Sequence, residues 1–287
     1  MLIGTFTDNY IVVSIKEETE EKAVYICKKS RGDDNIKYTV VKLKNMANAD
    51  KFVEYFTTNI NKEEFLDFIE CFVFDESLYF VYLNHKAPSL GEGVLKKDHK
   101  FIERLEIGKN IINKMVYMNM PFAIQCNVLD VDKIMVEEDL SISFDYDFCE
   151  VDQIDKCTIR DVARLLLGIM NLIFRKEVEL NSSDEINEFL EYLVDGKYEK
   201  YIDFLYKYNE MYKAVKDKPE AELQKPRTRL YILWETTKII LKKLKVVLMV
   251  GLVLGALAYL GFTIINKMKP SPVTGKSMAS IGEVPLK

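Results

Sequence analysis

Residues 1–85 contain short apolar runs that are rich in β-branched and aromatic side chains. Such runs, separated by polar turns, predict β-strands. The predicted strands are Tyr10–Ile15, Ala23–Lys28, Lys37–Lys44, Phe65–Phe74 and Ser77–Leu83, with a turn at Asp75–Glu76. One helix interrupts them, because Phe52, Tyr55 and Phe56 recur at helical spacing within Asn48–Ile60.

From about residue 98 the apolar residues recur at spacings of three and four, which predicts helices. The predicted helices are Asp98–Asn119, Asp161–Phe174, Ser182–Gly196 and Tyr198–Val215, and a short β pair, Lys133–Val136 with Ser141–Phe144, precedes the second. Ser182 and Glu185 can form a capping box at the start of the third helix, and Gly196 can end it.

Strands in the first part of the chain and helices in the second predict an α+β, bilobal fold. We expect a β-rich lobe at residues 1–97 and a helical lobe at residues 98–215. The polar stretch 216–245 is expected to be a linker and a basic segment beside a membrane.

The membrane prediction comes from residues 246–265, an uncharged apolar run. About 20 apolar residues are enough for a helix to cross the hydrocarbon core of a bilayer. The chain is therefore predicted to be a single-pass membrane protein with a short tail, residues 266–287. Gly251 and Gly255 form a GxxxG pair, which permits close helix approach and a homodimer, although such pairs also arise by chance.

Charge is distributed unevenly along the chain. Residues 225–245 hold seven basic residues and one acid, a charge of +6, and the tail carries +3. Because the whole chain has a net charge of −5, residues 1–224 carry −14. This acidic domain argues against nucleic-acid binding, and the basic segment is expected to lie against anionic lipid. The basic excess also predicts a cytoplasmic location for the large N-terminal domain.

Cysteines and histidines give no sign of a metal site or a disulfide framework. The chain has five cysteines without CxxC spacing and only two histidines. We expect reduced cysteines in a cytosolic domain, and neither a metal nor a cofactor.

The order of the motifs resembles the protein kinase fold over residues 10–215. Lys42, in the third strand, matches the lysine that contacts nucleotide phosphates in kinases, and Glu54 in the following helix is its candidate partner. Residues 127–136 resemble the catalytic loop and residues 143–147 the metal-binding DFG segment. Asp161 resembles the aspartate that opens the central helix of the large lobe. The resemblance implies a two-lobed kinase-like domain with Lys42, Glu54 and Asp145 as relics of a nucleotide site.

The same positions argue against phosphoryl transfer, which depends on positioned charges. The loop that should be rich in glycine, residues 16–22, has no glycine and four carboxylates. The catalytic triplet is replaced by Cys126, Asn127 and Val128. Lys133 stands where the second magnesium ligand is expected, and Asp147 replaces the DFG glycine. The interval between Asp147 and Asp161 is too short for an activation segment. No catalytic residue is predicted.

A kinase-like domain followed by one spanning helix resembles the EssB/YukC membrane subunits of bacterial type VII secretion systems. The resemblance implies a scaffold that binds protein partners at the membrane, but that family has a sizeable domain after the helix, where this chain has residues 266–287. The alternatives are an atypical membrane-bound serine/threonine kinase that uses Lys42, Asp145 and either Asp130 or Asp132, and a tail-anchored adaptor of no kinase ancestry.

Overall fold

The computed structural model describes residues 1–5, 8–44, 49–61, 63–97, 99–147, 156–223 and 237. The chain divides into two compact units, Met1–Pro226 and Arg227–Lys287, and the account below concerns the first. Within the described ranges no helix is long and apolar enough to cross a membrane. The predicted spanning segment 246–265, with Gly251 and Gly255, lies outside them.

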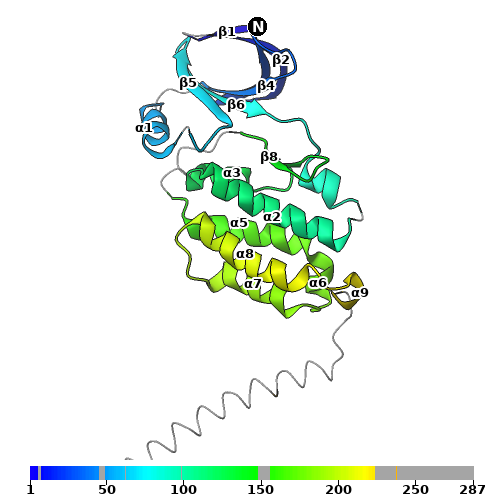
Figure 1. Cartoon of the computed structure of the whole chain (residues 1–287). Helices are drawn as coiled ribbons and strands as arrows, with labels where there is room; N and C mark the ends of the chain where they lie inside the picture. Colours follow the sequence, from blue (N-terminus) through cyan, green and yellow to red (C-terminus); the bar gives the residue numbers. More distant parts are fainter. Residues whose placement is uncertain are drawn as a thin grey trace, which may run out of the picture. The chain divides into compact units, whose positions relative to one another are not determined.

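The first part of the chain folds into one curled antiparallel sheet of six strands (Figure 1). The strands are β1 (Leu2–Gly4), β2 (Asn9–Glu18), β3 (Lys22–Lys29), β4 (Lys37–Leu43), β5 (Phe68–Phe74) and β6 (Ser77–Asn84). Their order across the sheet is β1-β2-β3-β4-β6-β5. Helix α1 (Ala49–Asn59) connects β4 to β5 and, with the sheet, makes up what we call the sheet region.

The predicted strands and the predicted helix are confirmed, and the sequence analysis missed β1. The predicted turn between β5 and β6 is also confirmed, since Asp75 and Glu76 have φ angles of 49° and 52°. Two consecutive positive φ angles produce the backbone twist that joins neighbouring antiparallel strands in a tight hairpin.

The two faces of the sheet bury different sets of side chains. The concave face encloses a small core of Ile3, Tyr10, Ala23, Tyr25, Cys27, Val40, Tyr79 and Val81. The hydroxyl of Tyr10 donates to Glu70 across the curl at 2.6 Å. The opposite face packs on α1, where the rings of Phe56 and Phe80 lie 4.4 Å apart between centroids.

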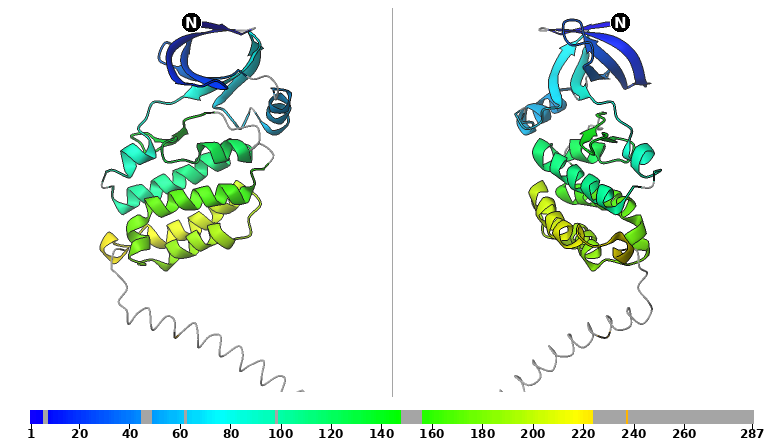
Figure 2. Two further views of the ribbon diagram at one scale, coloured as in Figure 1. Left: turned by 180° about the vertical axis from the view of Figure 1, so that it is seen from behind. Right: turned by 45° about the vertical axis from the view of Figure 1, so that its right-hand side comes forward.

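The second part of the chain, the helical region, begins with a single π-helical turn at Leu90–Val94. Its helices are α2 (Phe101–Met118), α3 (Phe122–Val128), α5 (Ile159–Ile173), α6 (Arg175–Glu179), α7 (Asp184–Asp195), α8 (Tyr201–Val215) and α9 (Glu220–Leu223). Along the chain, α3 is followed by a hairpin of β7 (Ile134–Val136) and β8 (Ile142–Phe144), and then by α5 (Figure 2). The α+β class predicted from the sequence is confirmed.

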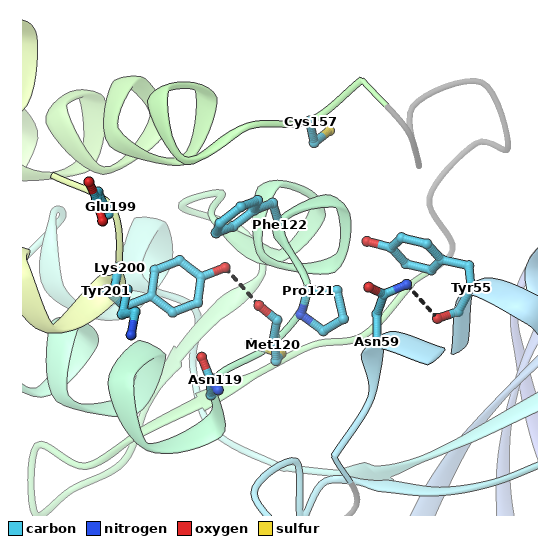
Figure 3. Close-up of a pocket in the computed structure, with 10 residues that line it drawn as sticks. All are labelled: Tyr55, Asn59, Asn119, Met120, Pro121, Phe122, Cys157, Glu199, Lys200 and Tyr201. Atoms are coloured by element: carbon cyan, nitrogen blue, oxygen red, sulfur yellow. Dashed lines mark hydrogen bonds between the residues drawn. The ribbon is translucent and has the colours of Figure 1, made fainter. Parts of the chain in front are cut away.

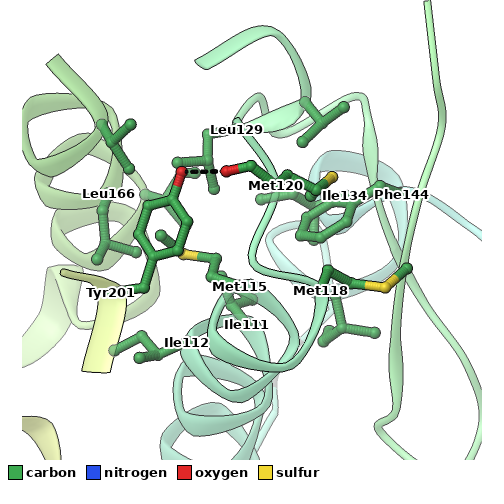
Figure 4. Close-up of a cluster of buried hydrophobic side chains, with 14 of the residues drawn as sticks. Ile111, Ile112, Met115, Met118, Met120, Leu129, Ile134, Phe144, Leu166 and Tyr201 are labelled. Atoms are coloured by element: carbon green, nitrogen blue, oxygen red, sulfur yellow. Dashed lines mark hydrogen bonds between the residues drawn. The ribbon is translucent and has the colours of Figure 1, made fainter. Parts of the chain in front are cut away.

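Helix α2 packs against α5 and α8, with methionine, isoleucine and tyrosine side chains in the core (Figure 4). Tyr208 of α8 is fully buried and donates to the carbonyl of Leu105 at 2.7 Å. It lies so close to Gly108 that a Cβ there would stand 2.5 Å from the tyrosine hydroxyl oxygen. Glycine is therefore required at this helix crossing.

Several details differ from the sequence-based expectations. The N-cap of α7 is Ser183, which accepts from the backbone N–H of Ile186, and not Ser182. Ser182 instead donates to the carbonyl of Glu177. The segment expected to be a linker contains α9, whose Leu223 is buried.

Candidate functional site

Charged side chains from both regions meet at the junction between them. Lys16 and Lys22, from the β2–β3 hairpin, contact the segment that follows β8. The ammonium group of Lys16 donates to Asp145. The ammonium group of Lys22 lies 3.1 Å from a carboxylate oxygen of Asp147 and 3.1 Å from one of Glu17.

The helical region holds the two aspartates in place through backbone and amide hydrogen bonds. The N–H of Asp145 donates to the carbonyl of Lys133 at 2.8 Å. Asn127, near the end of α3, donates to the carbonyl of Asp147 at 3.0 Å and accepts from Lys133 at 3.1 Å. The ammonium group of Lys133 is also 3.7 Å from the Asp147 carboxylate. We call Lys16, Lys22, Asn127, Lys133, Asp145 and Asp147 the junction cluster.

Electrostatics favour the charged form of Lys22. Burial alone would lower the pKa of this lysine, because a buried ammonium group loses its hydration. Hydrogen bonds to Glu17 and Asp147 outweigh that effect, and the pKa is raised. Lys22 is therefore positively charged beside Asp147 at physiological pH.

The junction cluster brings together Asp145, Asn127 and Lys133, three of the residues singled out in the sequence. In a nucleotide site Asp145 would hold a metal ion, but here its carboxylate receives the Lys16 ammonium group. Across the part of the chain that the structure describes, no group of three or more His, Cys, Asp or Glu side chains is arranged to hold a metal ion.

Lys42 and Glu54 are not brought together. Lys42 pairs with Tyr79 across the sheet, and its ammonium group lies 5.6 Å from the centre of that ring, on the face away from α1. Glu54 is exposed on α1. The β4 residue that faces α1 beside this position is Leu43, which is 6% exposed. Because side chains alternate along a strand, a one-residue difference decides which face a lysine occupies.

The residues that the sequence analysis compared with the catalytic triplet of kinases lie at the end of a helix. Cys126, Asn127 and Val128 are the last three residues of α3, an element that the sequence analysis did not predict. Val128 is completely buried. Asp130 and Asp132 are exposed in the turn after α3, where a carboxylate oxygen of Asp130 accepts from the N–H of Asp132 at 2.8 Å.

A buried network around Asp67 was missed in the sequence. Asp67 is 4% exposed and accepts a hydrogen bond from Tyr146 at 2.7 Å. Lys114 and His85 each place a nitrogen 3.5 Å from its carboxylate. Burial would raise the pKa of Asp67, but His85, Lys114 and Tyr146 outweigh it, and the pKa is lowered. The signal in the sequence was an acid between apolar residues, one of two in the run Phe65–Phe74, since a buried carboxylate needs partners.

Tyr146 connects this network to the junction cluster, since it lies between Asp145 and Asp147 in the sequence. Its ring stacks on Tyr82 with 4.8 Å between centroids and an interplanar angle of 16°. Burial and the Asp67 carboxylate raise the pKa of the tyrosine well above its usual value. The side chain is therefore fixed in the core as a neutral hydrogen-bond donor.

An open groove of about 360 Å³ lies at the boundary of α1 with α3 and α8 (Figure 3). Its lining residues are Tyr55, Asn59, Asn119, Met120, Pro121, Phe122, Cys157, Glu199, Lys200 and Tyr201. The hydroxyl of Tyr201 donates to the carbonyl of Met120, and the side-chain amide of Asn59 donates to the carbonyl of Tyr55. The groove therefore presents ordinary surface chemistry and no acid–base pair.

Comparison with known proteins assigns no family. No model of a protein family matches the chain, and no curated protein matches it significantly.

Proposed function

We propose that the chain is a membrane-anchored, catalytically inactive, kinase-like scaffold. The order of elements supports the kinase-like interpretation. Strands β2, β3 and β4 are followed by α1, then by β5 and β6, and then by a helical region in which the β7–β8 hairpin precedes Asp145. This is the order in which the kinase motifs were recognised in the sequence.

The observation that carries the proposed lack of catalysis is the pairing of Lys16 and Lys22 with Asp145 and Asp147. In a kinase the carboxylate that corresponds to Asp145 binds Mg²⁺, and the metal ion contacts the nucleotide phosphates. Two further positions also argue against catalysis. Leu43 and not Lys42 faces α1, and the buried Val128 has no group that can accept a proton.

The membrane part of the proposal rests on the sequence of residues 246–265. With a −14 charge on residues 1–224 and a basic segment at 225–245, the acidic domain would stand in the cytoplasm and offer its surface to protein partners at the membrane. Type VII secretion remains the narrower hypothesis. It rests on the architectural resemblance alone.

Nucleotide binding is the decisive test of inactivity. We expect no thermal stabilisation of the full chain in detergent when Mg²⁺ and ATP are added. A ligand at 100 times its dissociation constant would stabilise the fold by about 2.7 kcal/mol, which for a domain of this size shifts the melting temperature by a few degrees. Differential scanning fluorimetry would detect such a shift.

The control is the double variant Lys16→Ala, Lys22→Ala, which removes both ammonium groups from the aspartates. It should also show no ATP effect, since Leu43 still takes the place of a lysine that faces α1 and Val128 is unchanged. A shift in the wild type that is lost in Asp145→Asn would refute the proposal and favour the atypical-kinase alternative. A shift that appears only in the double variant would show that the site is blocked and has not been lost.

The topology has its own test. In intact cells, an impermeant thiol reagent should label a cysteine introduced at Ser277 and should fail to label one introduced at Glu20, which is exposed at the β2–β3 turn. The reverse pattern would refute a cytoplasmic domain. Labelling of both positions would refute the spanning segment.

A further inference from the structure

The chain passes only once from the sheet region to the helical region. Residues 85–88, between β6 and the π-helical turn, have no regular secondary structure. Among the described residues, the strands and helices of each region pack mainly on elements of the same region. A short connection between two such bodies is where a hinge rotation takes place.

Residues 145–147 of the helical region contact the sheet region on two sides. The middle residue, Tyr146, is 1% exposed and donates to Asp67 inside the core. The two outer residues instead receive the ammonium groups of Lys16 and Lys22, from the β2–β3 hairpin. The segment is therefore buried against the sheet region on one side and covered by charged side chains on the other, which we call the hairpin side.

Further contacts accompany Tyr146 on the buried side. The ammonium group of Lys114, on α2, lies 3.5 Å from the Asp67 carboxylate. Asn119, the residue that follows α2, donates to Glu64 at 2.7 Å, and it also lines the groove of Figure 3. These contacts join α2 to the residues just before β5. We call this part of the junction the pivot side.

The tip of the hairpin is fixed to β4. Residues 16–22 contain no glycine, and Lys44, just after β4, makes two hydrogen bonds to their carbonyl groups. Its backbone N–H donates to Glu21 at 2.8 Å, and its ammonium group donates to Thr19 at 2.7 Å. A motion of the tip away from the helical region therefore carries the sheet region with it.

The ion pairs of the hairpin side are the contacts that salt weakens most. The side chains of Lys16 and Lys22 are 39% and 24% exposed, whereas that of Asp67 on the pivot side is 5% exposed. Exposed ion pairs contribute little and are screened by salt, but a buried hydrogen bond to a carboxylate is costly to break. The hairpin side should therefore separate while the pivot side stays in contact.

We propose that Lys16 and Lys22 form an electrostatic latch, and that its release lets the sheet region rotate about the pivot side. In the open state Asp145 and Asp147 exchange these lysines for solvent. The latch sets the angle between the two regions, and therefore which of their surfaces a protein partner meets together. The inference goes beyond the proposed lack of catalysis and does not depend on it.

Distances between two spin labels, measured by double electron–electron resonance on the full chain in detergent, test the latch. One pair, at Glu20 and Asp130, crosses the hairpin side, and a second pair, at Thr58 and Lys200, crosses the pivot side; all four positions are exposed. Unnatural amino acids carry the labels, so the native cysteines stay unmodified. In low salt each pair should give one distance. In 1 M NaCl, where charges are screened beyond about 3 Å, a second, longer distance should appear for the first pair only.

Two double variants of equal charge change are compared. Lys16→Ala, Lys22→Ala removes the latch, whereas Lys28→Ala, Lys37→Ala removes two lysines elsewhere in the sheet region. Two exposed ion pairs together shift the ratio of open to closed molecules by up to roughly thirtyfold. The latch variant should therefore show the longer distance already in low salt, and the control variant should show it only in 1 M NaCl.

An exchange of charges tests the pair itself. Lys16→Asp should open the hairpin side in low salt, and Lys16→Asp, Asp145→Lys should close it again, because the two charges are restored in exchanged positions. Circular dichroism shows whether each variant is folded, and the salt series on the wild type decides the outcome for any variant that is not. A single distance for the first pair in all conditions would overturn the inference. So would equal opening in the control variant, or lengthening of both pairs together.

Discussion

Two sets of ion pairs in this chain each join a basic side chain to a carboxylate, but one set is buried and the other is partly exposed to solvent. Inside the helical region, Arg104 of α2 forms two hydrogen bonds with Glu177 of α6, at 2.7 and 2.8 Å. The Glu177 side chain is fully buried, and that of Arg104 is 9% exposed. At the junction, Lys16 pairs with Asp145, and there the lysine side chain is 39% exposed.

The difference in burial gives the two sets different roles. A buried charge without its partner keeps the full cost of its lost hydration, so Arg104 and Glu177 are indispensable to each other. An exposed pair exchanges its partner for water at little cost and is weakened by salt. The buried pair therefore fixes α2 to α6, whereas the Lys16 and Lys22 pairs at the junction are adjustable contacts.

The strongest test of this contrast is Glu177→Ala, which leaves the Arg104 guanidinium buried with only the carbonyl of Ile173 as acceptor. We expect a loss of about 3–5 kcal/mol in the free energy of unfolding, measured by urea denaturation of the full chain in detergent. The control is Glu179→Ala, which breaks the exposed pair with Arg175 and should leave stability unchanged. Equal effects in the two variants would contradict the contrast.

A second, smaller effect is expected at the Asp67 network. Tyr146→Phe removes the hydroxyl that donates to the buried carboxylate and should cost about 1.5–3 kcal/mol, the range for hydrogen bonds to charged groups. Tyr206→Phe, at a side chain that is 65% exposed, is the matched control. If the two variants unfold at the same urea concentration, the hydrogen bond does not stabilise the fold.

The same network predicts a dependence on pH. Because folding lowers the pKa of Asp67, its stabilising contribution is present above the usual value of 3.8 and is lost as the pH falls through the folded-state pKa. Asp67→Asn should therefore destabilise the protein at pH 7 and approach the wild type below pH 3.8. Unfolding curves at several pH values would show the convergence, and a constant difference would rule out this origin.

The smallest effects are expected at the junction. Lys16→Ala and Lys22→Ala should each cost about 0–1 kcal/mol, and 1 M NaCl should abolish the difference. Lys28→Ala, which breaks an exposed pair within the sheet region, should have no effect. A loss well beyond that range that persists in high salt would mean that the junction is as rigid as the helical region.

Local pattern was enough to predict most of the fold. Runs of β-branched and aromatic residues located β2, β3, β4 and β6, and helical spacing located α1, α2, α5 and α8 to within a few residues. The Asp75–Glu76 turn followed from two polar residues between apolar strands. Helices α3, α6 and α9 were missed because they are too short to show a helical period, and strand β1 was missed as well.

For the candidate site, the sequence alone determined which residue types stand at the positions that were compared with kinase motifs. The absence of glycine in residues 16–22 and the presence of Val128 and Lys133 followed from the chain by itself. Asp67 was not singled out, because its partners Tyr146 and Lys114 are distant in the sequence.

Only the tertiary structure decided which charges meet. Lys42 faces away from α1 because of its register in β4, and Lys16 reaches an aspartate 129 positions along the chain. Secondary structure follows from neighbours in sequence, whose spacing can be read directly. Ion pairs depend on the packing of distant elements, and a shift of one residue moves a side chain to the other face of the sheet.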